Sequence, residues 1–198
     1  MAKEYQDPVI DIMRKSAAVP EYQQMMDYLM TRRAVPEMQT RYMGTSIGGL
    51  FQYGGTLQPR GKISVTEGAS ADTLIHEVTH AAERQMGQQY YEDKTAKRDI
   101  LGFVQPNSTQ FTDAYDKINT QQILGTLNQN WTDKAARYRS TTSEARAFAM
   151  ENVTNPELDP KSITRAPAHI DSTLATEFMI LLDLAKRGMK DRPQSQGR

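Results

Sequence analysis

The stretch "KISVTEGASADTLIHEVTHAAERQ", residues 62–85, decides how the rest of the chain is interpreted. Apolar and polar residues alternate in "KISVT" (62–66), which is typical of a strand with one buried face. From Ser70 or Asp72 onward the apolar residues recur at helical spacing, and Gly87 is a common kind of helix terminator. The stretch therefore predicts a strand that is followed directly by a helix.

Two of the three histidines of the chain lie on this helix, and a glutamate stands directly after the first. Because residues four apart lie on one face of a helix, His76 and His80 can present their ring nitrogens to a single ion. Zinc binds neutral imidazole at tetrahedral positions and leaves room for a third protein ligand and a water. Glu77 is placed to take a proton from that water, which ionises near neutrality. The pattern predicts a zinc site with a general base.

The composition restricts which residues can complete this site and which partners are expected. The chain has no cysteine, so a metal must be held by His, Asp or Glu side chains. Its 24 basic residues balance its 24 acidic ones, which gives no reason to expect a nucleic acid or a membrane as partner. With 198 residues we expect one domain over 1–190 and a flexible tail at 191–198.

The remaining sequence predicts helices and one small sheet. Pro8 and Pro20 suit the first turn of a helix, and Pro36 begins another, shorter helical piece. Glycines then break residues 44–68 into short extended pieces, of which "LFQY" (50–53) is a second strand. Further helices are expected at 20–33, at two or three places between 93 and 137, at 141–153, and at about 170–187 with Gly188 as terminator. The expected fold class is α+β, mainly helical.

The sequence shows neither an export signal nor a membrane span. The first residues, "MAKEYQDPVI", contain no apolar stretch of signal-peptide length. The longest strongly apolar run is "FMILL" (178–182), which is far shorter than a membrane span. We therefore expect a soluble protein in the cytoplasm of the cell that makes it.

The motif "HEVTH" and the strand before it resemble the zincin metallopeptidases over residues 62–85 and one later helix. The resemblance implies a zincin-like domain that hydrolyses peptide bonds with zinc, with Glu77 as general base and an edge strand before the motif helix. It also implies a substrate that lies antiparallel along Ile63, Ser64 and Val65 as an added strand. A protein, a short peptide or a peptidoglycan cross-link would each present the amide that this chemistry requires.

The third metal ligand separates the branches of this family. The metzincin branch needs a glycine and a histidine where this chain has Glu83 and Met86, so that branch is excluded. In the gluzincin branch a later helix supplies a glutamate, and the resemblance points to Glu144 in "SEARAFA" (143–149). The family often has an aspartate four residues further on, where this chain has Phe148. Support for the histidine ligands must then come from elsewhere.

Other interpretations of these residues stay open at the level of the sequence. Glu144 could instead cap its own helix together with Thr141. The chief rival as third ligand is His169, followed by Glu83, Glu151 and the aspartates. Zincins use a tyrosine or histidine to donate to the developing oxyanion, and the candidates here are Tyr90, Tyr91, Tyr138 and His169.

Two functional interpretations follow. The first is a small, one-domain zinc peptidase of the gluzincin type. The second is a non-enzymatic protein that keeps the zincin fold as a structural or assembly piece of a bacteriophage particle, with other virion proteins as partners. The chain is rich in Met and Gln and has no cysteine, which is the character of a bacteriophage-encoded protein. Retention of Glu77 favours the enzyme, because a structural zinc site needs ligands and no general base.

Overall fold

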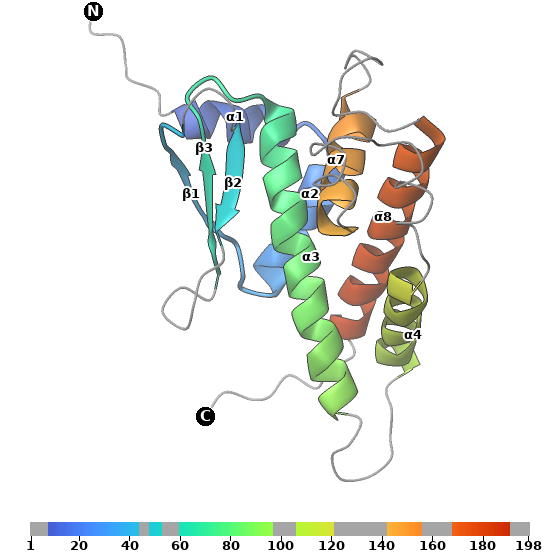
Figure 1. The fold of residues 1–198 in the computed structure, drawn as a ribbon. Helices are drawn as coiled ribbons and strands as arrows, with labels where there is room; N and C mark the ends of the chain where they lie inside the picture. The colour runs from blue at the N-terminus through green and yellow to red at the C-terminus, as the bar shows by residue number, and fades with distance from the viewer. Residues whose placement is uncertain are drawn as a thin grey trace, which may run out of the picture.

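The computed structural model describes residues 8–43, 48–52, 60–96, 106–120, 142–155 and 168–190. The helices of this part are α1 (Pro8–Ser16), α2 (Pro20–Thr31), α3 (Ala71–Ala96), α4 (Pro106–Thr120), α7 (Thr142–Thr154) and α8 (Ala168–Lys190). The strands are β1 (Glu37–Thr40), β2 (Gly49–Gln52) and β3 (Lys62–Val65). The fold is mainly helical with one small mixed sheet, as predicted, and α3 lies between the sheet and the pair α7 and α8 (Figure 1).

Strand β3 forms the centre of the sheet. The strand order is β1-β3-β2, with β1 parallel and β2 antiparallel to β3. Ile63 pairs with Met38 on one side and with Phe51 on the other. The side chains of Ile63, Ser64 and Val65 are buried. The prediction that this segment is an edge strand to which a substrate adds is therefore wrong, because both of its edges already pair with neighbouring strands.

Strand β1 occupies a segment for which the sequence predicted a helical piece beginning at Pro36. The N–H of Glu37 donates to the carbonyl of Gly61 (3.2 Å), and the N–H of Arg41 donates to the carbonyl of Val65 (2.9 Å). These bonds extend the ladder with β3, and tertiary pairing of this kind overrides a weak local preference. The two extended pieces predicted at 50–53 and 62–66 are present as the strands β2 and β3, which pair antiparallel.

Helix α3 continues past Gly87 to Ala96, although the sequence predicted its end at the glycine. A Cβ added to Gly87 would lie 3.1 Å from the hydroxyl of Tyr115, which belongs to α4. The glycine therefore permits a close approach of α4, and the helix tolerates it at a cost of about 1 kcal/mol. Helix α8 likewise runs past Gly188 and ends at Lys190.

The hydrophobic core is one cluster to which β3 and the helices α1, α2, α3, α4, α7 and α8 contribute. Helix α2 buries Tyr22, Met25 and Leu29, whereas Met30 is 55% exposed. Helix α8 buries an apolar face that consists of Leu174, Phe178, Leu181 and Leu182. Short buried side chains on α7 allow it to pack against both α3 and α8; these are Ala145, Ala147 and Ala149.

Some predictions fall outside the described residues. These are residues 97–105 and 121–137 of the region 93–137, the position of Tyr138, and the tail at 191–198. Of the two or three helices expected between 93 and 137, α4 is described. The helices predicted at 141–153 and 170–187 are present as α7 and α8. Of the helices described, none combines the length and the apolar character that crossing a membrane requires.

We expect Leu29→Ala to lower the free energy of unfolding by about 2–5 kcal/mol, because it leaves a cavity in a fully buried part of the core. Its neighbour Met30 is 55% exposed, so Met30→Ala should change the same quantity by about 0.5 kcal/mol or less. Urea unfolding followed by circular dichroism measures both. Equal effects of the two substitutions would contradict this assignment of the buried face of α2.

Candidate metal centre

The centre forms where α7 packs antiparallel against α3. At one end of the contact Asn155 on the loop after α7 donates its amide N–H to Asp72 near the start of α3 (2.6 Å). At the other end the guanidinium of Arg146 lies 2.5 Å from Glu83. Residue numbers thus fall along α7 as they rise along α3, and the two polar contacts bracket the segment of α3 that carries the histidines.

The three predicted ligands converge between these contacts. Nε2 of His76 lies 3.2 Å from Nε2 of His80 and 3.3 Å from a carboxylate oxygen of Glu144. The other oxygen of Glu144 lies 3.5 Å from Nε2 of His80. Ligands about 2.0–2.1 Å from a tetrahedral zinc would be about 3.3 Å from one another. The donor set and its spacing therefore fit one ion, and this group could hold a metal.

The outer nitrogen of each histidine also has a partner. Nδ1 of His76 lies 3.2 Å from a carboxylate oxygen of Glu151, and Nδ1 of His80 lies 2.9 Å from the hydroxyl of Ser143. The ring of Phe148 packs edge-on against His76, with 4.5 Å between the ring centroids. Each Nδ1 is thus bound to α7, while both Nε2 atoms point to the same place.

The rival ligands are arranged differently. Glu83 is paired with Arg146, and Glu151 contacts the outer nitrogen of a histidine and does not join the cluster. Glu144 points at the two histidines of α3. Thr141, its partner in the capping role considered above, lies outside the described residues. His169 is the second residue of α8, and its side chain also lies outside the described part.

Glu77 lies on the side of α3 that faces strand β2. Its side chain is 6% exposed and accepts a hydrogen bond from the backbone N–H of Phe51. Burial raises the pKa of this carboxyl, while the nearby His76 and His80 and the Phe51 N–H oppose the shift. A buried carboxylate with a raised pKa, next to a metal-ligand cluster and outside it, has the properties of a general base.

Strand β2 approaches Glu77 closely because it has no side chain at Gly49. A Cβ added there would lie 2.7 Å from Oε1 of Glu77 and 2.8 Å from the methyl group of Thr73. Neither distance is tolerable for packed atoms. Gly49 is a residue that the sequence did not single out, and only the close passage of the strand over α3 identifies it.

The carboxylates around His76 favour its protonated form. Burial opposes protonation of His76, but its hydrogen bonds to Glu144 and Glu151 outweigh burial and raise its pKa to about 9. A metal ion must displace this proton, as it does at any imidazole ligand.

The tyrosines proposed as oxyanion donors are not brought to the centre by the described structure. Tyr91 follows His80 by eleven residues, which is about 16 Å along a helix, and its side chain is 71% exposed. Tyr90 donates its hydroxyl to Asp116. Tyr138 and the side chain of His169 lie outside the described residues.

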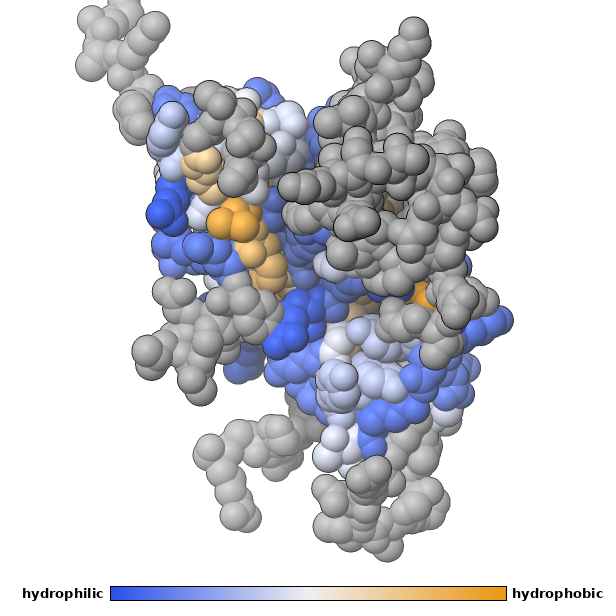
Figure 2. Space-filling view, in the orientation of Figure 1, coloured by the Kyte–Doolittle hydropathy of each residue, from blue (hydrophilic) through white to orange (hydrophobic). Residues whose placement is uncertain are grey.

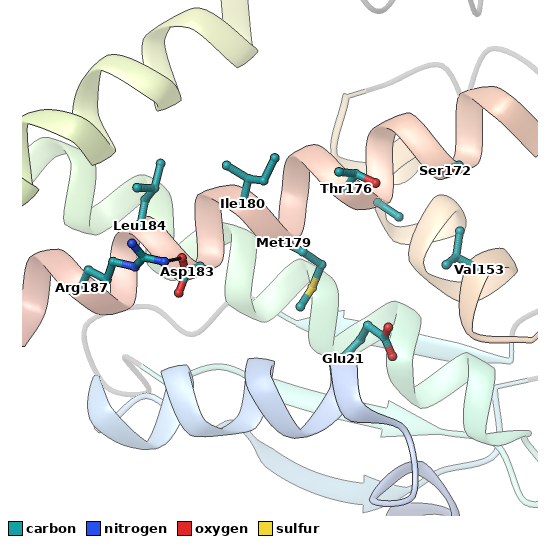
Figure 3. A pocket seen from close by; sticks show the side chains of 10 residues that line it. Glu21, Val153, Ser172, Thr176, Met179, Ile180, Asp183, Leu184 and Arg187 are labelled. Atoms are coloured by element: carbon teal, nitrogen blue, oxygen red, sulfur yellow. Dashed lines mark ion pairs between the residues drawn. The ribbon is translucent and has the colours of Figure 1, made fainter.

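A separate hollow of about 440 Å³ lies along α8, near the ends of α2 and α7 (Figure 3). Its lining includes Glu21, Val153, Met179, Ile180, Asp183 and Arg187. Apart from Glu21, its charged groups form an ion pair of 2.5 Å between Asp183 and Arg187. None of the residues of the metal centre lines it.

Comparisons with protein-family models, with curated proteins and with solved structures find no match for this chain. The assignment of the site therefore depends on its own geometry.

Glu144→Ala should weaken zinc binding by at least about 100-fold, since loss of a ligand costs more than the 10- to 100-fold loss of a supporting group. Equilibrium dialysis of the chelator-treated protein against zinc, with metal analysis of the retentate, measures the affinity. His169→Ala provides the comparison and should keep the wild-type affinity. The reverse result, with affinity lost only in His169→Ala, would give the third-ligand role to His169.

Gly49→Ala should lower the free energy of unfolding by about 1–3 kcal/mol, because the new methyl group overlaps Glu77 and Thr73. Gly48→Ala is the matched control, since a Cβ there meets Thr73 at an ordinary contact distance of 3.4 Å. Thermal and urea unfolding of both variants, in the absence of metal, provide the measurement. A Gly49→Ala variant as stable as wild type would show that β2 does not lie this close to Glu77.

Proposed function

We propose that this protein is a zinc-dependent metallopeptidase of the gluzincin type. The observation that carries the proposal is the position of Glu77. This buried carboxylate follows the first histidine of the cluster, is not part of the ligand group, and lies against the backbone of β2. A site that only held zinc for structural reasons would need the ligands His76, His80 and Glu144 and would have no use for Glu77.

Zinc bound by His76, His80 and Glu144 would supply a Lewis acid for the scissile carbonyl and would make a water acidic near neutrality. Glu77 removes a proton from the attacking water, whose oxygen bonds to the carbonyl carbon. The same carboxyl then gives the proton to the amide nitrogen as the C–N bond breaks, which regenerates the base. Because Glu77 is 6% exposed, bulk solvent competes little for this proton.

Strand β2 replaces β3 as the strand that a peptide would join. Within the described residues β2 pairs with β3 alone, and its backbone at Phe51 contacts the general base. A peptide added along β2 would carry its amide bonds past Glu77. Figure 2 shows apolar surface over the sheet next to α3. Leu50 on β2 is 40% exposed. An apolar substrate side chain would be in contact with this surface.

Glu77→Gln should abolish nearly all cleavage that a chelator inhibits, a loss of about 10²- to 10⁴-fold in rate, while zinc binding is unchanged. The substitution keeps the size of the side chain and leaves all three ligands in place. Wild type and variant are loaded with zinc and assayed on a broad peptide library, on unfolded protein and on peptidoglycan fragments.

Two outcomes would contradict the proposal. Wild type and variant that bind zinc and are equally inert on every substrate would favour a structural role for the centre. Undiminished cleavage by the variant would show that Glu77 is not the base. Zinc content measured on the same samples separates a lost base from a lost metal.

A further inference from the structure

Helix α7 presents one stripe of side chains to His76. Glu144, Phe148 and Glu151 are spaced by four and then three residues, so they lie on the same face of the helix. Each contacts the same imidazole: Glu144 at Nε2 (3.3 Å), Glu151 at Nδ1 (3.2 Å) and Phe148 at the ring (4.5 Å between centroids). His76 is therefore held from three directions by a single helix.

The contact of Glu151 determines which nitrogen of His76 can bind a metal. A carboxylate at Nδ1 accepts a hydrogen bond only if that nitrogen carries the proton. The proton at Nδ1 leaves the lone pair at Nε2, the nitrogen that faces His80 and Glu144. The negative charge behind the ring also makes Nε2 a stronger donor to a cation.

The two histidines receive unequal support. His80 contacts the neutral hydroxyl of Ser143 (2.9 Å), whereas His76 contacts a carboxylate. The side chain of Glu151 is 17% exposed, so solvent screens its charge only in part. Helix α7, which carries Glu151, is anchored to α3 just after its end, where Asn155 donates a hydrogen bond to Asp72 (2.6 Å). Asp72 lies one helical turn before His76.

We propose that Glu151 is a positioning residue of the metal centre, which fixes the tautomer and orientation of His76 and strengthens its bond to zinc. Glu151 lies seven residues, or two helical turns, after the proposed ligand Glu144. Phe148 lies between them, one turn after Glu144. The inference rests on the proposed function only in its assignment of zinc to the ligand group, and it can be tested without a substrate.

The test compares Glu151→Gln, Glu151→Ala and wild type in the full-length protein. Zinc affinity is measured by competition with a chromophoric chelator. Glu67→Gln, which removes one exposed carboxylate outside the centre, controls for the change in net charge. We expect Glu151→Gln to weaken zinc binding by about 10- to 100-fold, Glu151→Ala to weaken it further, and the control to be unchanged. Circular dichroism of the metal-free proteins verifies folding. If Glu151→Ala is unfolded, the comparison of the isosteric Glu151→Gln with wild type carries the test.

The visible absorption of bound Co²⁺ provides the second readout, because its intensity and band positions report the number and geometry of the ligands. Glu151→Gln should keep the wild-type spectrum, since all three ligands remain, whereas Glu144→Ala should change it. Wild-type zinc affinity in both Glu151 variants would overturn the inference. So would a Glu151→Gln spectrum altered as in Glu144→Ala, because Glu151 would then be a ligand itself. Wild-type protein that binds no zinc would overturn both this inference and the proposed function, whereas zinc binding without peptide cleavage would overturn only the latter.

Discussion

The antiparallel packing of α7 against α3 is the constraint on which the candidate site depends. His76 and His80 come from α3, and Glu144 comes from a helix that follows it by many residues, so the cluster exists only in one register of the two helices. The contacts Asp72–Asn155 and Glu83–Arg146 hold that register at both ends. Buried alanines on α7 allow the two helices to approach closely, which brings Glu144 within reach of the ion that His76 and His80 could bind.

The electrostatics of the centre favour a cation. Glu77, Glu144 and Glu151 surround His76 and His80 in a largely buried volume, and buried carboxylates are costly unless charge compensates them. Glu144 and Glu151 outweigh the burial of His76 and raise its pKa to about 9, which is the same preference for positive charge. A divalent ion would supply more of it at the point where the Nε2 atoms and Glu144 meet.

The sequence predicted the local features well and the long-range ones less so. The motif helix, its two histidines and the extended pieces that form β2 and β3 follow from periodicity and spacing, and Glu144 followed from the family resemblance. Strand β1 and the central place of β3 were missed because their partners lie far along the chain. The Nδ1 contact of Glu151 depends on how two helices are rotated against each other, which spacing within one helix does not specify. Gly87 was misread because Tyr115, the neighbour that explains it, belongs to α4.

X-ray absorption spectroscopy at the zinc edge, on the full chain reconstituted with one equivalent of zinc, tests the central claim most directly. The geometry of His76, His80 and Glu144 predicts two imidazole nitrogens and one carboxylate oxygen at about 2.0–2.1 Å, with one further light ligand completing a four-coordinate ion. A spectrum with no imidazole scattering, or with only the oxygen shell of hydrated zinc, would contradict a metal centre formed by α3 and α7.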